Sequence, residues 1–518
     1  MVIVKGVCRV IPGESTISSE AGTGILVNQD IAPGEPILQI HEPFLRVLDS
    51  PRLMDTCENC IYNLTNEFGE RRAIDLSKCG GCGVVRYCSE KCQKTSWKHH
   101  HKYECKIFKS LHPRVLPNTV RLTMQFFLRL KARLIEKSDL QIFLGLEDHL
   151  EHFQKLPSSA PNSFENIQLM AQAVKEYSKG SEPLVAIQKM LCLIIVNTLT
   201  LTTPVLDTLG LVIDPLLSLI NHSCNPNTAI TFNGSTSSVR SLRAIPSGTE
   251  ITVSYIDNTF SRKTRILELQ SRYFFNCTCQ DCKNGTTVGK ASISPPQDLE
   301  NLLQSLPDNQ TGLEMGLKAC VTANYPPHAQ PYAALRDRYI LTLIGEKNFK
   351  RAFQHALVRY FFIDSVHYPT TFHPVRVVRL MTLHRLIGVF MSNDHRGGWG
   401  PDTDWKKEGW DYRNWPSVFI SFMMEYKEGL RKSHGEETGI WDNLQAFEKR
   451  ISREMPEGGF TKAEQRKAEL WAKLRRIAEK WKDVVCYSPE IEEQAKKEGR
   501  AASLPESEVV MEPPKRQV

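Results

Sequence analysis

"NHSCNPN", residues 221–227, comes directly after the apolar run 216–220. The stretch places three asparagines, a histidine and a thiol around a proline, where a buried strand or helix is expected to end. Buried polar groups need hydrogen-bonding or metal partners, so this stretch needs partners from elsewhere in the chain. The other cysteines are the first place to look for them.

Seven of the 15 cysteines lie within residues 57–105, at short spacings that are more typical of metal ligands than of disulfides. A gap of two residues lets a tight turn aim both sulfurs at one metal, and a gap of three places both ligands on one helix face. The pairs are Cys57 and Cys60, Cys79 and Cys82, Cys88 and Cys92, and His101 and Cys105. Eight ligands predict two zinc sites. The alternative, a metal-free thiol cluster, would leave a polar segment of about 50 residues without a core.

Three consecutive histidines, His99, His100 and His101, compete for the eighth position. Ligands at i and i+4 share one face of a helix, which selects His101 as the partner of Cys105. His99 and His100 are then expected to be solvated.

A third metal site is predicted from the later cysteines. The sequence CTCQDC offers Cys277, Cys279 and Cys282, one ligand short of a closed tetrahedron. Cys224 of NHSCNPN can supply the fourth, so that a zinc ion would tie the later loop onto the polar stretch. The alternative is that Cys224 is a small buried apolar residue. We therefore predict three zinc ions.

The composition is that of a globular protein. Of 518 residues, 41% are hydrophobic and 24% are charged, and the net charge of +7 is too mild to indicate nucleic acid by itself. The apolar run at 190–196 is far shorter than the roughly 18 residues of a membrane helix, and the first residues lack the pattern of a secretory signal. We expect no membrane association and a location in the nucleus, the cytoplasm or both.

Hydrophobic periodicity divides the chain into strand-rich and helix-rich parts. Short apolar runs between turns predict strands in residues 1–56 and 205–260, and apolar spacing of three and four predicts helices in 106–200 and 295–485. The second helical part suggests antiparallel pairs, interrupted by a Gly- and Trp-rich loop at 396–415. Residues 487–518 are rich in Glu, Lys and Pro with few apolar residues, and are predicted to be disordered.

The motif CENC…CGGC…YCSEKC…HKYEC resembles a MYND zinc finger. The resemblance implies two interleaved zinc sites. One would use Cys57, Cys60, Cys88 and Cys92, and the other would use Cys79, Cys82, His101 and Cys105. The gap between Cys60 and Cys79 is longer than in the family pattern, which implies a larger loop and removes no ligand.

NHSCNPN, then GTEITVSY ending at Tyr255, then YFFNCTCQDC form the ordered signature of a SET domain with its post-SET loop. Together with the finger and the helical C-terminal half, they make the chain resemble the SET and MYND domain protein-lysine methyltransferases from near residue 1 to about 485. The resemblance implies an α+β fold, with a β-rich SET core, an inserted MYND finger, a Cys-rich post-SET loop and an all-helical, repeat-like C-terminal domain. The implied divisions are a first SET part at 1–56, the finger at 57–105, a helical insertion with the second SET part at 106–260, a post-SET zinc loop at 261–290, the helical domain at 295–485 and a disordered tail at 487–518.

The resemblance also implies a function, the S-adenosylmethionine-dependent N-methylation of a lysine in a histone or non-histone protein. Methyl transfer is an in-line displacement at a carbon activated by a sulfonium, so the site must align the reactants more than supply an acid or base. By resemblance Tyr255 and Tyr273 are catalytic, because their hydroxyls can orient the amine in a narrow apolar channel that disfavours the ammonium form. Taken alone, either could be a buried tyrosine with a satisfied hydroxyl.

The donor-binding residues are implied in the same way. In AGTGILV, Gly22 and Gly24 let the backbone approach the donor closely, and Thr23 lies between them, where the family more often has a basic residue nearby. The other positions are Asn197, Ser218, Asn221, His222, Tyr255 and Phe275, of which Phe275 would stack on the adenine ring. Outside the motif, two glycines would usually make a turn, a helical asparagine a cap or a solvated group, and Phe275 a core residue.

The finger suggests several kinds of partner besides the protein substrate. Residues 86–109 carry seven Lys or Arg against two Glu, which could bind DNA or an acidic partner or could be the solvated outside of the finger. DNA is not favoured, because no aromatic array or reading helix is evident. MYND fingers resemble peptide-binding modules, so a proline-rich segment is a competing ligand, and the chain is expected to be a monomer.

The competing function is a catalytically silent scaffold that recruits partners in transcriptional regulation. Such a scaffold would use the finger and the C-terminal helices, and would not need the tyrosines. The presence of Tyr255, Tyr273 and the whole NHSCNPN motif argues against it.

Overall fold

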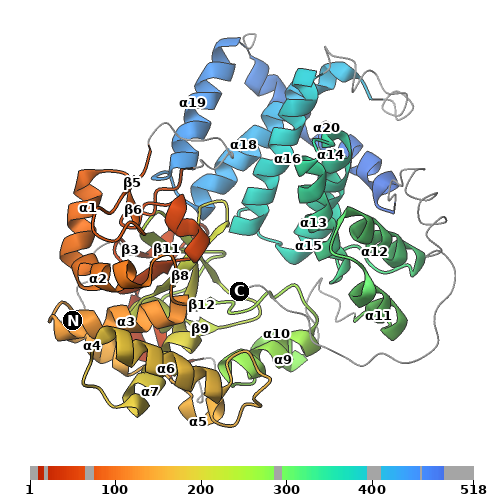
Figure 1. The fold of residues 1–518 in the computed structure, drawn as a ribbon. Helices are drawn as coiled ribbons and strands as arrows, with labels where there is room; N and C mark the ends of the chain where they lie inside the picture. The colour runs from red at the N-terminus through yellow and green to blue at the C-terminus, as the bar shows by residue number, and fades with distance from the viewer. Residues whose placement is uncertain are drawn as a thin grey trace.

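The computed structural model of the chain describes residues 10–16, 22–64, 75–284, 294–393, 410–454 and 458–483. The predicted tail at 487–518 and most of the Gly- and Trp-rich loop at 396–415 lie outside these ranges. At the end of that loop, the rings of Trp410 and Trp415 lie 5.1 Å apart in the core of the helical half. Figure 1 shows this helical half beside a mixed N-terminal half built around short strands, and the predicted α+β fold class is confirmed.

The strands of the N-terminal half pair across long sequence distances, so the two predicted strand regions form one core. One antiparallel sheet has the order β10-β11-β3, a second has the order β4-β8-β7, β1 and β2 form a hairpin, and β9 pairs in parallel with β12. Along β11, half-buried and buried side chains alternate, as expected of a strand with one face on the core. The strands are β1 (Val10–Glu14), β2 (Thr23–Val27), β3 (Pro36–Ile40), β4 (Leu45–Leu48), β7 (Leu199–Thr202), β8 (Thr208–Ile213), β9 (Asn221–His222), β10 (Thr228–Asn233), β11 (Thr236–Ser241) and β12 (Thr252–Val253).

The Cys-rich segment forms a small unit on the outside of this core. It consists of the strand pair β5 (Ser77–Lys78) and β6 (Arg86–Tyr87), followed by α1 (Glu90–Ser96) and α2 (Lys102–Leu111). The π-helical turn Trp97–His101 joins the two helices without a break. Val85 and Tyr87 share an apolar cluster with Leu201, Leu209 and Phe232 of the strand core, so the unit is packed onto that core.

A bundle of helices follows the finger and covers the lower side of the core in Figure 1. Its apolar cluster is made chiefly by α3 and α7, where Leu122, Phe126 and Leu191 are buried. Leu199 and Thr200, the last residues of the part predicted as helical, instead begin strand β7 (Leu199–Thr202), because β-branched threonines alternate there with leucines and favour an extended chain. The helices are α3 (Asn118–Lys131), α4 (Lys137–Leu144), α5 (Leu150–Phe153), α6 (Phe164–Ser178) and α7 (Leu184–Asn197).

One short helix, α8 (Pro215–Ser218), lies between β8 and β9, and two further helices, α9 (Arg262–Tyr273) and α10 (Gln280–Asn284), connect β12 to the C-terminal half. Helix α9 lies within the segment predicted as a zinc loop, and the Ser261 hydroxyl caps it by accepting the Thr264 N–H at 3.3 Å. A rigid helix therefore carries Tyr273 toward the cysteines that follow it.

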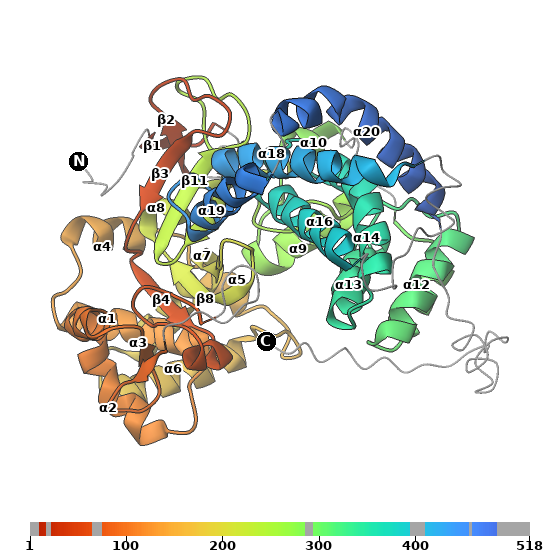
Figure 2. The ribbon, with the colours of Figure 1, turned by 90° about the horizontal axis from the view of Figure 1, so that it is seen from above.

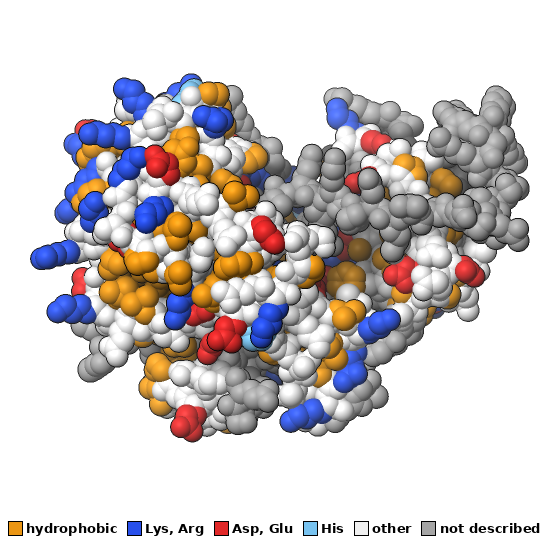
Figure 3. Space-filling model, turned by 60° about the horizontal axis from the view of Figure 1, so that its bottom comes forward, with side chains coloured by type: hydrophobic (Ala, Val, Ile, Leu, Met, Phe, Trp, Pro, Cys, Tyr) orange, Lys and Arg blue, Asp and Glu red, His pale blue; other side chains and the backbone are white. Residues whose placement is uncertain are grey.

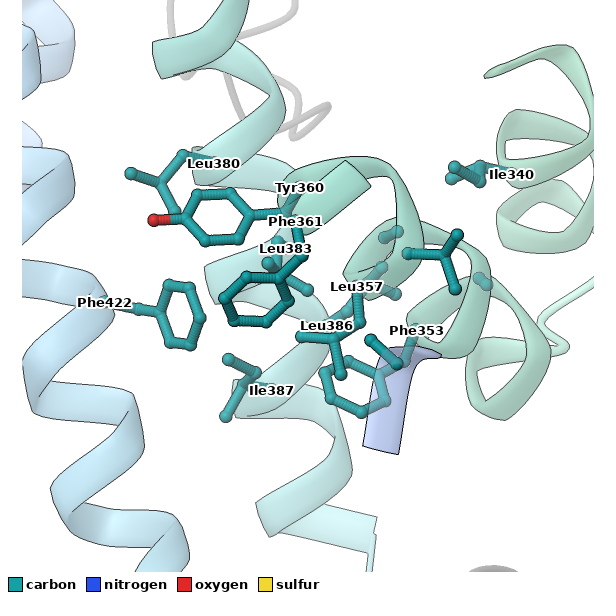
Figure 4. Close-up of a cluster of buried hydrophobic side chains, with 14 of the residues drawn as sticks. Ile340, Phe353, Leu357, Tyr360, Phe361, Leu380, Leu383, Leu386, Ile387 and Phe422 are labelled. Atoms are coloured by element: carbon teal, nitrogen blue, oxygen red, sulfur yellow. The ribbon is translucent and has the colours of Figure 1, made fainter. Parts of the chain in front are cut away.

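The C-terminal half is all-helical in its described parts. Helices α11 to α18 pack on one another largely in chain order, and α20 packs back on α18 and α14. Figure 4 shows side chains of α14, α16 and α18, such as Leu357, Leu383 and Phe422, converging on one apolar cluster. None of the described helices is long and apolar enough to cross a membrane. The helices are α11 (Gln297–Ser305), α12 (Gln310–Thr322), α13 (Tyr332–Gly345), α14 (Phe349–Val358), α15 (Ser365–His367), α16 (Pro374–Asn393), α18 (Trp415–Ser433), α19 (Gly439–Glu454) and α20 (Gly459–Trp481), with a π-helical turn at Arg359–Asp364.

The helical half is fixed to the strand core by hydrogen bonds that cross between them. Figure 2 shows α18 and α19 lying beside β3 and β11. Buried His434, just after α18, contacts the Pro204 carbonyl through Nε2 at 2.9 Å, and Asn233 of β10 donates to the Glu437 carbonyl at 2.7 Å. Gln330 donates to the Thr259 hydroxyl at 2.8 Å, close to the segment that carries the predicted site.

Candidate functional site

Two groups of four metal ligands meet in the finger. One is Cys57, Cys60, Cys88 and Cys92, the other is Cys79, Cys82, His101 and Cys105, and within each group all ligand atoms lie within 4.8 Å of one another. The Cys60 and Cys88 sulfurs are 3.5 Å apart, and the Cys79 and Cys105 sulfurs are 3.9 Å apart. Tetrahedral zinc with bonds of about 2.3 Å separates its sulfurs by about 3.8 Å, so both groups fit a zinc ion.

The ionisation states of His101 and Cys57 suit a metal. Burial lowers the pKa of His101 to about 4, so its imidazole is neutral, and its Nε2 lies 3.3 Å from the Cys79 sulfur. The side chain of Cys60, with nearby backbone N–H groups, lowers the pKa of Cys57 to about 5. Zinc requires a neutral imidazole and thiolates; burial raises the pKa of Cys82, Cys88 and Cys105, so the binding of zinc would release the protons of these thiols.

The expectation that His100 is solvated is wrong, whereas His99 is exposed as predicted. His100 is buried, and its Nε2 lies 2.5 Å from Oε1 of Glu58. Although burial opposes it, the charge of Glu58 raises the pKa of His100, and the two side chains form a buried ion pair. Glu58 adjoins Cys57 and His100 adjoins His101, so the pair joins the two ligand groups.

The third group of cysteines also comes together. Cys224 of the NHSCNPN stretch meets Cys277, Cys279 and Cys282, and the Cys224 sulfur lies 3.9 Å from that of Cys277 and 3.6 Å from that of Cys282. The four thiols fit a third zinc ion. Arg262 of α9 donates to the Cys282 carbonyl at 3.0 Å, which holds the ligand segment against that helix.

His222 joins this group to the predicted catalytic residues. Its Nδ1 accepts the backbone N–H of Tyr255 at 3.0 Å, and its Nε2 lies 3.4 Å from the Cys224 sulfur. Burial lowers the pKa of His222 to about 4, so the ring is neutral. Because Nδ1 accepts a hydrogen bond, the single ring proton is on Nε2 and points toward the sulfur. Strands β9 and β12 pair His222 with Val253, and this register positions His222 for its contacts with Tyr255 and Cys224.

Tyr255 and Tyr273 form one aromatic group with Phe275. The Tyr255 hydroxyl donates to the Ile220 carbonyl at 2.7 Å, and the Tyr273 hydroxyl donates to the Tyr255 carbonyl at 3.2 Å. The two tyrosine rings are 5.0 Å apart, and Phe275 lies 6.4 Å from the ring of Tyr255 and 6.0 Å from that of His222. Burial raises the pKa of both tyrosines, so both hydroxyls are neutral at physiological pH.

Gly24 is needed for a reason that the sequence does not reveal. A Cβ at Gly24 would lie 2.2 Å from Oε1 of Glu250 and 3.1 Å from Nδ2 of Asn221. Asn221 donates to Glu250 at 2.7 Å, and the same carboxylate accepts from Thr16 N–H at 2.7 Å and from the Ser15 hydroxyl at 3.0 Å. Glu250 thus fixes Asn221 and the N-terminal hairpin around a glycine that makes room for it.

The other residues predicted to bind S-adenosylmethionine form two pairs, Gly22 with Thr23 and Asn197 with Ser218. At Gly22, φ is +64° and the space that a Cβ would occupy is open, while the carbonyl of exposed Thr23 accepts from Asn221 at 3.3 Å. Asn197 meets Ser218, whose hydroxyl donates to the Asn197 carbonyl at 3.2 Å. The side chain of Asn197 donates to the carbonyls of Glu147 and Leu193 at 2.9 and 2.8 Å.

Sequence reasoning missed Glu250 and Arg265. Glu250 is 3% exposed, and the signal for it was a single carboxylate at the start of the apolar strand in GTEITVSY. Arg265 of α9 is also buried, and although burial opposes it, the side chains of Cys224 and Cys282 raise its pKa. Its guanidinium offsets the negative charge of the third thiol group, and no pattern in the sequence pairs an arginine of one helix with cysteines on two other segments.

Comparisons with known proteins agree with this geometry. The SET domain family model matches residues 22–256. The SET domain and MYND-type zinc finger protein 6 of Schizosaccharomyces pombe is 29% identical over 68% of each chain. Human histone-lysine N-methyltransferase SMYD3 is 29% identical over 52% of this chain and 61% of its own. A solved structure of the SET domain of LSMT bound to lysine and AdoHcy covers 94% of each chain at 13% identity, with a TM-score of 0.24 that is too low to support an argument.

The matched segments span about two thirds of the fission-yeast protein and less than two thirds of the human protein. The family model match, residues 22–256, contains Tyr255, Glu250 and Cys224, whereas Tyr273 and the other three cysteines of the third group lie beyond it. The family match therefore includes the part of the site that precedes residue 257.

Proposed function

We propose that this chain, which belongs to the family of SET and MYND domain-containing protein-lysine methyltransferases, transfers a methyl group from S-adenosylmethionine to a lysine side chain of another protein. The acceptor class is a histone or non-histone protein with an accessible lysine. Catalysis requires a site that orients two bound reactants and excludes water.

The observation that carries the proposal is the series of contacts from the third thiol group to the tyrosine pair. His222 contacts the Cys224 sulfur on one side and the Tyr255 backbone on the other. The Tyr255 carbonyl in turn accepts from Tyr273, which ends the helix that leads to the other three cysteines. A zinc ion bound there would hold both tyrosines in one fixed geometry.

The surrounding residues suit a nucleoside-containing sulfonium donor. Half-buried Phe275 offers an aromatic face for adenine, and the open space at Gly22 lets a ligand approach the backbone. Asn221 and His222 bring polar groups to the same place. When bound, S-adenosylmethionine supplies a methyl group on positively charged sulfur; the amine lone pair forms the N–C bond as the C–S electron pair stays with sulfur, which leaves a thioether and a methylated ammonium.

The tyrosine hydroxyls orient the acceptor instead of removing its proton. Burial raises the pKa of both, so neither is an anionic base at physiological pH. The acceptor lysine must give its proton to solvent and arrive neutral, which an apolar surrounding of tyrosine and phenylalanine rings favours. The two hydroxyls are then placed to restrict rotation of the amine so that its lone pair points at the methyl carbon.

The remaining expectations on partners are part of the proposal. Lys and Arg side chains gather on the part of the surface that holds the finger and the insertion helices, α3 to α7, at the left of Figure 3. We favour a proline-rich peptide over DNA as a ligand of the finger, because Trp97, 46% exposed, lies on the basic turn between α1 and α2 and suits apolar peptide contacts. A monomer acting in the nucleus, the cytoplasm or both remains our expectation.

Methyl transfer to lysine is tested with donor labelled in the methyl group. The purified zinc-loaded chain is incubated with labelled S-adenosylmethionine and a protein extract, and hydrolysed product is analysed for methyl-lysine and methyl-arginine. We expect label in methyl-lysine, and a fall in kcat of about 100-fold for Tyr255→Phe because the acceptor loses an orienting hydroxyl.

Donor binding is measured on the same preparations by calorimetry. Tyr255→Phe should still bind the donor, since the hydroxyl acts on the acceptor. Absence of any binding heat at donor concentrations on the order of 1 mM would favour the catalytically silent scaffold instead.

A further inference from the structure

Phe274 adopts a backbone conformation that side chains with a Cβ rarely take. Its φ is +60° and its ψ is +26°, in the left-handed region that favours glycine. It lies between Tyr273 and Phe275, which both belong to the aromatic group of the site. A strained residue at such a position persists only where its surroundings stabilise it strongly.

The stabilising surroundings are three aromatic rings of the four-residue helix α5 and its N-cap, which we name the α5 cradle: His149, His152 and Phe153. The Phe274 ring stacks on His152 with centroids 5.2 Å apart and an interplanar angle of 28°. It meets Phe153 edge-on at 4.8 Å and His149 at 5.4 Å. Phe153 is buried in the apolar cluster of the insertion helices, and this packing holds the cradle in place.

The cradle is itself fixed to the site. His149 also has a left-handed backbone, with φ of +50°, and caps α5. The Asn197 side chain donates to the Glu147 carbonyl just before it at 2.9 Å, and the Ser218 hydroxyl donates to the Asn197 carbonyl. Two residues expected to contact the donor thus also hold the turn on which Phe274 rests.

The turn at Phe274 decides the direction of its neighbours. With the Phe274 ring seated in the α5 cradle, Tyr273 donates to the Tyr255 carbonyl and Phe275 lies near His222 and Tyr255. We propose that docking of the Phe274 ring in the α5 cradle positions Tyr273 and Phe275, so that Phe274 is a positioning residue for methyl transfer. This inference depends on the proposed function, because Tyr273 and Phe275 matter only if acceptor and donor bind beside them.

The test compares two phenylalanines of the full-length, zinc-loaded chain. Phe274 and Phe164, the first residue of α6, are both half-buried and packed against the same apolar cluster, but Phe164 is not part of the cradle. Phe274→Ala should lower kcat by at least about tenfold through Tyr273 and raise KM for the donor through Phe275. Phe164→Ala should lower only the melting temperature, with kcat and KM within about twofold of the wild type.

Phe274→Gly separates the ring from the backbone turn. Glycine adopts the left-handed conformation readily, so this variant keeps the turn and loses the docked ring. We expect it to be as defective as Phe274→Ala. His152→Ala should reproduce part of the loss, and combining it with Phe274→Ala should add little, because both changes remove the same contact.

Three results would overturn the inference: a loss in kcat of less than about tenfold in Phe274→Ala, wild-type activity in Phe274→Gly, or an equal loss of kcat in Phe164→Ala. Each requires an active wild type. If the wild type itself transfers no methyl group to lysine, the proposed function fails first, and the two failures are thereby distinguished. The zinc content of every variant should remain at three per chain.

Discussion

The two ligand groups of the finger and the third thiol group use the same kind of ligand, but they are assembled and connected differently. The finger groups draw all their ligands from residues 57–105, and a buried ion pair between Glu58 and His100 joins them. The third group joins Cys224 to Cys277, Cys279 and Cys282, and His222 connects it to Tyr255. The ligands of the finger thus connect residues within one small unit, whereas the ligands of the third group are connected to the catalytic site.

The difference indicates two roles for zinc in one chain. A metal held by ligands near one another in sequence stabilises a small module that has little apolar core of its own. A metal held by ligands from distant segments also fixes the orientation of whatever those segments carry, here the two tyrosines. Loss of a zinc ion from the finger should therefore lower the stability of the finger, and loss of zinc from the third group should lower the rate of methyl transfer.

Removing one zinc ligand from each region is the most direct way to break this comparison. Cys224→Ser should reduce the zinc content from three to two and lower kcat by about 100-fold or more, because His222 and the segment after α9 lose their common anchor. Cys82→Ser should also reduce the zinc content to two, but kcat at low temperature should fall less than about fivefold. Zinc is counted by atomic emission and kcat by transfer of labelled methyl groups.

Equal loss of activity in both variants would show that the roles are not separate. In that case the finger would contribute to the site through the apolar cluster that it shares with β7, β8 and β10. Thermal melting of both variants, measured in parallel, distinguishes a misplaced site from a chain that has unfolded.

Gly24→Ala sharpens the comparison on the side of the site. The new methyl group would overlap Oε1 of Glu250 and displace Asn221, so we expect affinity for S-adenosylmethionine to fall by about tenfold or more. The matched control is Gly80→Ala in the finger, where no atom lies within 4 Å of the added carbon. Calorimetric titration of both variants with the donor checks this. Unchanged donor affinity in Gly24→Ala would remove Glu250 and Asn221 from the donor site.

Glu58→Gln addresses the finger alone and should have the smallest effect on activity. Breaking a buried ion pair leaves His100 without its countercharge, and we expect the local stability of the finger to fall by about 3 kcal/mol. Amide hydrogen exchange in α1 and α2 reports this loss, while kcat stays near that of the wild type. Glu90→Gln, which breaks an exposed pair with Lys94, is the control and should leave exchange unchanged. A large fall in kcat for Glu58→Gln would mean that the finger and the site are coupled.

The sequence predicts well those features that depend on short-range spacing. The cysteine pairs and the long helices follow from gaps of two to four residues, which local geometry alone determines. The grouping of Cys224 with Cys277, Cys279 and Cys282 follows because a closed tetrahedron requires a fourth ligand. Strand β7 was missed because Leu199–Thr202 continues the apolar spacing of α7, and only pairing with β8 reveals it.

Features that depend on one specific long-range partner could not be predicted. His100 is equivalent to His99 in the sequence, and only the approach of Glu58 makes one of them buried. Glu250 depends on Ser15, Thr16 and Asn221, which come from two other segments. Phe274 reads as one more apolar residue in YFF, and its role depends on a backbone angle and on rings of the insertion.

The π-helical turn at Trp97–His101 makes the finger sensitive to changes in its length at this point. Such a turn accommodates an extra residue in a wider loop of the backbone. The two adjacent histidines have different partners: His100 forms the ion pair with Glu58, and His101 is a ligand of the metal group. Deleting one residue here would remove the extra residue that the wide turn accommodates, and would shift the histidines relative to Glu58 or to the other metal ligands. The chain should therefore accept insertions and deletions in the long gap after Cys60 far more readily than in these five positions, even though both lie in the same finger.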